Sequence, residues 1–160
     1  ALKNKHLHRN FQGYCTRETT GQVYAFGASS ISQLDSAYIQ NIKNASQYIN
    51  SIEKNNLAVL RGYSVNKDQK IIREIINSIM CNYFVDINII AKKYNLQAPE
   101  LYNLIKFKKG NLDDFIEDEI LEFKDDIILV KESGRLFTRN IAMRFDPLID
   151  QKVGSYSNTV

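Results

Sequence analysis

The apolar positions divide the chain into an early part with short extended segments and a later part with amphipathic helices. Short strands are predicted at Phe11–Tyr14 and Val23–Phe26, where apolar and aromatic residues stand between glycines. The run Gly27–Ser32 is small and polar, the composition of a loop that lets another group approach its backbone closely. These first segments show no obvious strand partners and look like the end of something larger.

Apolar residues that recur every three or four positions predict helices further along. A first helix is expected over about Leu34–Lys54, ending at Lys54–Asn56. An extended segment follows at Leu57–Val65. The strongest periodic signal is the isoleucine stripe of Lys67–Phe84, which Asn66 is suited to cap.

Shorter elements are predicted in the last part of the chain. The expected elements are helices at Ile87–Tyr94, Pro99–Lys106 and Asp113–Ile120, a hairpin of Leu121–Phe123 and Ile127–Val130 around the charged turn Lys124–Asp126, and a last helix that begins at Ser133 or Thr138 and stops before Pro147. Helices followed by a hairpin and another helix are the order of a winged-helix-like module. The sequence therefore predicts an α+β fold, with a boundary near residue 55.

The composition fits an ordered, soluble protein. The chain has 160 residues, of which 44% are hydrophobic, enough for one good core. Its apolar runs are far too short to cross a bilayer, and Ala1–Asn10 shows no signal-peptide pattern. We expect a cytoplasmic domain with no membrane partner.

Cysteine and histidine give no metal-binding pattern. Cys15 and Cys81 are isolated, which suits a reducing compartment and makes a structural disulfide unexpected. His6 and His8 lack a third ligand, so we expect them to be solvated.

The charge distribution bears on one alternative function. Asp86–Lys109 reads much like a helix-turn-helix, which makes a winged-helix nucleic-acid-binding module an alternative. Residues 98–130, however, contain four lysines and nine acidic residues, a net charge of −5 that DNA phosphates would repel. We therefore expect a scaffold role and no nucleic acid, while a plain protein-interaction module stays open.

Six short motifs stand in a fixed order along the chain: Leu7–Tyr14 (LHRNFQGY), Phe26–Ser32 (FGASSIS), Tyr38–Asn41 (YIQN), Arg61–Tyr63 (RGY), Ile79–Asn82 (IMCN) and Gly134–Ile141 (GRLFTRNI). Together they resemble the C-terminal part of oxygen-independent coproporphyrinogen III oxidases, a family of radical S-adenosylmethionine enzymes of haem synthesis. Related haem chaperones usually carry an Asn-x-x-Tyr-Trp pattern where this chain has Phe11–Tyr14. This chain has no tryptophan, so the oxidases are favoured.

The resemblance implies a fold and a reaction. Residues 1–55 would be the end of the radical S-adenosylmethionine barrel, and residues 56–160 a mainly helical, winged-helix-like cap with a small antiparallel hairpin. The intact enzyme would convert coproporphyrinogen III to protoporphyrinogen IX by radical oxidative decarboxylation. The partner of this chain would be the N-terminal barrel of the same protein, and the surface facing it should be apolar and bare.

The resemblance also implies cofactors, S-adenosylmethionine and a [4Fe–4S] cluster, in the intact enzyme. The family binds the cluster through a Cys-x3-Cys-x2-Cys motif that has no counterpart here. Two separate cysteines do not supply three thiolate ligands. We therefore expect this portion to hold no cluster and to be inactive alone.

Three residues match cofactor-binding positions of the family. Phe11 and Gln12 resemble positions that line the S-adenosylmethionine pocket, and Ile31 resembles one that contacts a second S-adenosylmethionine. A one-residue insertion between Gln12 and Ile31 makes Ser30 a rival for the last match. The alternative for Phe11 and Gln12 is that they only pack a strand end. No catalytic residue and no metal ligand is assigned.

Two arginines of the last predicted helix, Arg135 and Arg139, present guanidinium groups that suit the carboxylates of a substrate. Pairing with the acidic stretch 113–126 is the favoured alternative.

Overall fold

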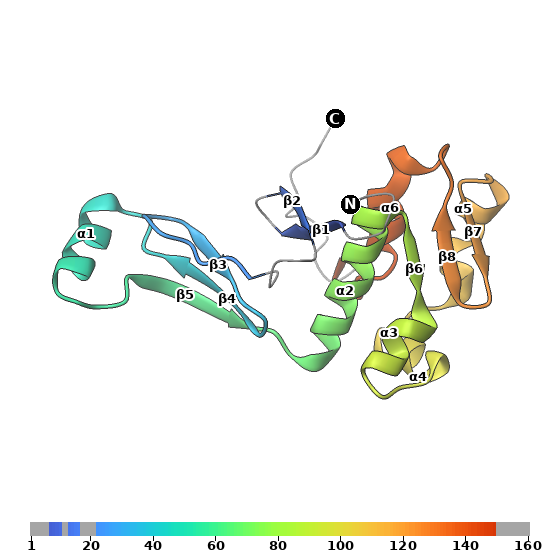
Figure 1. Cartoon of the computed structure of the whole chain (residues 1–160), viewed down its shortest axis with the longest axis horizontal. Coiled ribbons are helices and arrows are strands. Elements are labelled where there is room, and N and C mark those ends of the chain that lie inside the picture. Colours follow the sequence, from blue (N-terminus) through green and yellow to red (C-terminus); the bar gives the residue numbers. More distant parts are fainter. Residues whose placement is uncertain (1–6, 11–12, 17–21, 150–160) are drawn as a thin grey trace. The chain divides into compact units, whose positions relative to one another are not determined.

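The computed structural model describes residues 7–10, 13–16 and 22–149, with side chains from residue 22 onward (Figure 1). The chain forms two compact units, a first unit at Ala1–Lys70 and a second unit at Ile71–Val160. The expected mixed α+β fold is confirmed, with antiparallel strand pairing in both units. No helix among the described residues is long and apolar enough to span a membrane.

The first unit is built mainly from antiparallel strands (Figure 1). Strands β1 (Leu7–Asn10) and β2 (Gly13–Thr16) pair with each other. A second sheet has the order β3-β4-β5, formed by Ile31–Gln33, Ala37–Asn41 and Val59–Ser64. Helix α1 (Ala45–Glu53) connects β4 to β5. It begins where the Asn44 side chain accepts a hydrogen bond from the Gln47 amide.

Two predictions for this unit are partly wrong. The helix expected from Leu34 begins only at Ala45, because Ala37–Asn41 forms strand β4 instead. Pairing with β3 on one side and β5 on the other satisfies the β4 backbone, a gain that helical periodicity does not reveal. The strand expected at Val23–Phe26 is reduced to a bridge between Val23 and Gln33, so this segment does have a partner within the chain.

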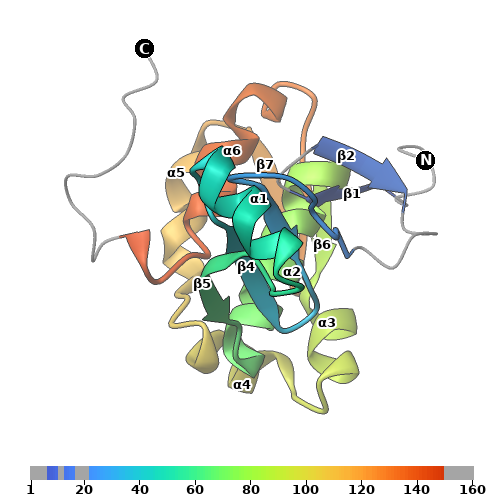
Figure 2. The ribbon, with the colours of Figure 1, turned by 90° about the vertical axis from the view of Figure 1, so that its left-hand side faces the viewer.

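The second unit contains most of the helices. Its elements are α2 (Lys67–Asn82, whose first turn belongs to the first unit), β6 (Phe84–Asp86), α3 (Ile87–Lys93), α4 (Ala98–Leu104), the 3₁₀ turn η2 (Lys109–Leu112), α5 (Asp113–Glu117), β7 (Leu121–Lys124), β8 (Ile127–Val130), the 3₁₀ turn η3 (Arg135–Phe137) and α6 (Thr138–Met143). The sheet order is β6-β8-β7, all antiparallel. Helices α3 and α4 lie side by side (Figures 1 and 2).

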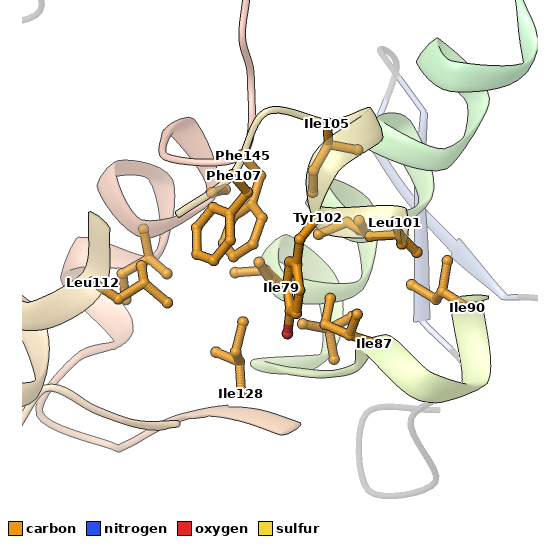
Figure 3. Packing of buried hydrophobic residues seen from close by; sticks show 14 of the residues in the cluster. Ile79, Ile87, Ile90, Leu101, Tyr102, Ile105, Phe107, Leu112, Ile128 and Phe145 are labelled. Carbon is orange, nitrogen blue, oxygen red and sulfur yellow. The ribbon is translucent and has the colours of Figure 1, made fainter. Parts of the chain in front are cut away.

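The core of the second unit follows from its isoleucine stripe. Ile71, Ile75 and Ile79 recur on one face of α2 and are fully buried. Phe107 and Phe145 belong to the same buried core as these isoleucines, and Figure 3 shows their rings stacked on each other. The ring centroids lie 4.3 Å apart. Each such side chain contributes about 1.5–3 kcal/mol relative to an exposed position. The predicted stripe therefore does organise the core.

The division between the units lies after the expected boundary near residue 55. Strand β5 begins at Val59 and pairs with β4, so a boundary at residue 55 would cut the sheet. The compact units divide between Lys70 and Ile71. Whether the two pieces are a barrel end and a cap stays a prediction.

Candidate functional site

The small polar loop that the sequence singles out lies before strand β3. Gly27 has φ of +99°, a conformation that glycine adopts without steric cost. Ser29 has φ of +63°, which is uncommon for a residue with a side chain. The loop Gly27–Ser30 is therefore held in a conformation that its neighbours must stabilise.

Asn41, at the end of β4, supplies much of that stabilisation. Its Nδ2 lies 3.0 Å from the Gly27 carbonyl oxygen, 3.1 Å from Ser30 Oγ and 3.3 Å from the Ala25 carbonyl oxygen. An amide has only two N–H groups, so these three acceptors share them. The Ser30 hydroxyl donates in turn to the Gly27 carbonyl at 2.6 Å. The Asn41 side chain thus links both ends of the loop Gly27–Ser30 by hydrogen bonds.

Backbone and side-chain bonds from other elements fix the loop from outside. The Gly27 amide donates to the Tyr48 hydroxyl on α1 at 3.0 Å, and the Ser29 amide donates to the Ile42 carbonyl at 2.9 Å. Gln40 Nε2 donates to the Ser29 carbonyl at 3.2 Å. The loop is consequently a rigid platform, suited to position the residue that follows it.

That following residue is Ile31, one of the three predicted cofactor-binding residues. It opens β3 opposite Gln40 and is half-buried. The Ser30 hydroxyl is engaged inside the loop, and the choice between Ile31 and Ser30 as the match to the family position stays a prediction. Phe11 and Gln12 lie outside the described residues, so the match of these two positions stays a prediction.

Asn41 is the important residue whose role the sequence analysis did not assign. In the sequence it stands out only as part of the motif Tyr38–Asn41. A glycine- and serine-rich loop leaves backbone carbonyl groups without partners. A polar residue close to such a loop is therefore a sequence signal for a side chain that binds those carbonyl groups. The three acceptors themselves could be found only from the fold.

A second polar cluster lies at the hairpin turn between β7 and β8. Asp126 Oδ1 accepts hydrogen bonds from the Tyr102 hydroxyl at 2.9 Å and from Lys109 Nζ at 2.7 Å. The bond from Lys109 is the main reason that the pKa of Asp126 lies below its usual range. Burial, followed by the bond to Asp126, raises the pKa of Tyr102. The interpretation of Lys124–Asp126 as only a charged turn is therefore wrong, because Asp126 ties the turn to α4 and η2.

Arg135 and Arg139 do not pair with the acidic stretch 113–126 within the described residues, while their contact with a substrate carboxylate stays a prediction. Arg135 lies 3.4 Å from Glu132 and above the Tyr83 ring, so pairing with the acidic stretch is wrong for this residue. Arg139 forms no ion pair within the part of the chain that the structure describes. Arg144 is the arginine that pairs with the acidic stretch, through Asp114 at 2.6 Å.

Metal-binding groups do not converge in the described ranges. No three His, Cys, Asp or Glu side chains come together there, and the Cys81 side chain is buried. The positions of His6, His8 and the Cys15 side chain lie outside what the structure describes.

Comparison with known proteins identifies relatives along the whole chain. No family model matches. The oxygen-independent coproporphyrinogen III oxidase of Escherichia coli is 34% identical over 147 residues, which cover 91% of this chain and 31% of that protein. The enzyme of that name from Bradyrhizobium diazoefficiens is 32% identical over 161 residues, covering 100% of this chain and 34% of the relative.

A solved structure agrees with these relatives. Coproporphyrinogen III oxidase (HemN) from Escherichia coli, described as a radical SAM enzyme, superimposes with a TM-score of 0.82 at 31% identity, over 93% of this chain and 33% of that one. The chain is a homologue of oxygen-independent coproporphyrinogen III oxidases. The expected resemblance to their C-terminal portion is thereby confirmed, and the chain spans about one third of the length of these coproporphyrinogen III oxidases.

Proposed function

We propose that this chain is the C-terminal portion of an oxygen-independent coproporphyrinogen III oxidase. In the intact protein it would take part in the radical oxidative decarboxylation of coproporphyrinogen III to protoporphyrinogen IX, in the cytoplasm. The observation that carries this proposal is the agreement of sequence and fold with HemN over 93% of the chain, at a TM-score of 0.82. Agreement over this length, and not at one motif, is hard to reconcile with an unrelated use of the fold.

The order of elements supports a winged-helix-like cap in the second unit. Helix α2, strand β6, helices α3 and α4 and the hairpin β7–β8 follow one another, and β8 inserts between β6 and β7. The acidic charge of residues 98–130 argues for a scaffold role of this cap, because phosphates would be repelled. The first unit would then be the end of the barrel.

The apolar surface of the first unit supports a barrel as its partner. Phe26 and Leu57 are each 88% exposed, and Leu60 on β5 is about half exposed. Among the described residues of this unit, Ala58 and Val65 are the buried hydrophobic ones. Exposed apolar side chains on this scale are typical of a surface that packs against another part of a protein.

The hydrogen bonds that hold the loop Gly27–Ser30 support a positioning role for Ile31. We expect Asn41 to hold Gly27–Ser30 so that Ile31 forms an apolar wall beside S-adenosylmethionine and excludes water there. Phe11 and Gln12 would line the same cofactor. When bound, the [4Fe–4S] cluster and S-adenosylmethionine supply the radical that begins decarboxylation. The donor set of this chain does not fit the cluster, since its two cysteines cannot provide three thiolates.

A chimeric enzyme tests the proposal. The matching third of the Escherichia coli enzyme would be replaced by residues 1–160, and protoporphyrinogen IX formation would be assayed under anaerobic conditions. We expect activity, and we expect I31D to lower it by at least about tenfold, because an unpaired charge is costly in a closed pocket. Q12A should also lower activity.

The matched control is I89D, since Ile89 is 66% exposed on α3 and distant in sequence from the loop. This variant should keep normal turnover. A chimera that folds and holds its cluster but makes no product would contradict the proposed function. An active chimera in which I31D turns over normally would contradict only the role of Ile31.

A further inference from the structure

The second unit contains a pocket of about 440 Å³ between the end of α4, α5 and α6. This volume is in the range of small-molecule sites. The apolar half of its lining comes from Ile105, Phe115, Met143, Pro147 and Ile149. Ile105 and Phe115 are buried members of the core, so this wall is part of the rigid scaffold.

The polar half of the pocket is rich in hydrogen-bond donors, which come from Lys106, Asn111, Asn140 and Arg144, and it also contains the carboxylate of Asp146. Within the described ranges, the side chains of Lys106, Asn111 and Asn140 make no hydrogen bond or ion pair. Asp146, the acid of the set, accepts a hydrogen bond from the Leu148 amide at 2.9 Å. Donors that lack internal partners are suited to an incoming acceptor.

Arg144 is held in place for such a contact. One of its nitrogens, Nη2, lies 2.6 Å from Asp114 Oδ2, and its guanidinium carbon lies 5.2 Å from the centre of the Phe115 ring. A guanidinium has five N–H groups, so most remain available after this ion pair. Asp114 neutralises much of the arginine charge, which leaves Lys106 as the main cation.

Lys106 occupies a backbone position where glycine would be more stable. It follows the last turn of α4 with φ of +56°, and the Phe107 amide donates to the Tyr102 carbonyl in the manner of a Schellman cap. A lysine in this left-handed conformation costs stability, and here it places a long cation at the rim of the pocket.

We infer that this pocket binds an amphipathic monocarboxylate, with the carboxylate at Lys106 and Asn140 and the apolar part against Met143 and the accessible edge of Phe115. Lys106 and two amides offer donors to a single carboxylate, whereas the Asp146 carboxylate in the same lining disfavours a dianion such as phosphate. The apolar wall provides for a chain or ring beyond the carboxylate. This site is separate from the loop at Ile31 and does not depend on the proposed oxidase function.

The test is a titration of the purified 160-residue chain with hexanoate, followed by amide chemical shifts in two-dimensional NMR. We expect saturable shifts at Lys106, Asn111 and Asn140. Hexylamine and inorganic phosphate, titrated separately, should bind at least about tenfold more weakly, since the first lacks the acceptor and the second lacks the apolar part.

Two variants remove the cation in different ways, K106M and K106G. Both should weaken hexanoate binding about tenfold, the loss of one charge-assisted hydrogen bond. K106G should also raise the melting temperature, because glycine suits the left-handed position, so a loss of binding there is not a loss of folding. The matched control K108M removes an exposed lysine outside the pocket and should bind normally.

Three results would overturn the inference. Hexylamine binding as tightly as hexanoate would mean that the pocket takes apolar chains without regard to charge. Unchanged hexanoate binding in K106G would remove Lys106 from the site. Shifts that stay linear up to about 20 mM hexanoate would mean that no specific site exists at the affinities typical of small ligands.

Discussion

Replacing Gly134 by alanine should destabilise the second unit strongly, although its backbone conformation is ordinary. Gly134 has φ of −84° and ψ of −6°, which any residue adopts. A Cβ built there would lie 2.2 Å from the Ile120 carbonyl oxygen and 2.6 Å from Ile120 Cγ2. Real Cβ atoms essentially never come within 3.0 Å of such atoms, so the two segments must separate.

The separation would break bonds that hold the end of the sheet. The same Ile120 carbonyl accepts a hydrogen bond from the Lys131 amide at 2.9 Å, and the Gly134 amide donates to the Lys131 carbonyl at 3.0 Å. Overpacking of this kind costs about 1–3 kcal/mol, and strain on the Lys131 bond adds about 1 kcal/mol. We expect the free energy of unfolding of G134A to fall by about 2–4 kcal/mol.

Urea denaturation followed by far-ultraviolet circular dichroism measures this change. The matched control is G110A, where the new Cβ would approach only the side-chain carboxylate of Asp113, at 3.3 Å. That side chain is exposed and can move, so G110A should stay within about 0.5 kcal/mol of the parent. A G134A protein as stable as G110A would refute the steric reasoning.

Three further results are expected. D126N should have a free energy of unfolding about 1 kcal/mol below that of the parent near neutral pH. Because folding lowers the pKa of Asp126, this difference in stability should persist above the ordinary pKa of 3.8 and shrink as the pH falls below it. An equal difference at pH 3 and pH 7 in urea denaturation would contradict the ion pair with Lys109. N41A should speed hydrogen exchange at the Gly27 and Ser29 amides by about tenfold, while Q40A should change it less. Equal exchange rates in the two variants would mean that Asn41 is not the residue that stabilises the loop. Anaerobic iron–sulfur reconstitution of this chain should yield no [4Fe–4S] cluster, and about four irons per chain with stable visible absorption would contradict the thiolate argument.

The second unit could be predicted well because its signals are local. The isoleucine stripe predicted Lys67–Phe84, and the helix spans Lys67–Asn82. The hairpin was predicted at Leu121–Phe123 and Ile127–Val130, and strands form at Leu121–Lys124 and Ile127–Val130. In each case, neighbours in the sequence are also neighbours in space.

The first unit was predicted less well because its structure depends on distant pairing. Ala37–Asn41 carries a helical pattern of apolar residues, yet it lies between β3 and β5 and takes its hydrogen bonds from both. The contacts of Asn41 with the loop and of Asp126 with Lys109 likewise join segments that no local pattern connects. The residue types suggested polar interactions, but only the fold supplied the partners.

Few apolar side chains are buried among residues 22–70 of the first unit, and this has a consequence for the chain when it is produced by itself. A sheet that carries Val59, Leu60 and Tyr63 on an exposed outer strand can add a strand from another molecule as readily as from its own protein. When made by itself, the chain should therefore self-associate through β5 as its concentration rises. Expression together with the N-terminal barrel that the proposed function implies should suppress this aggregation, and charged substitutions on β5 should keep the isolated chain in solution.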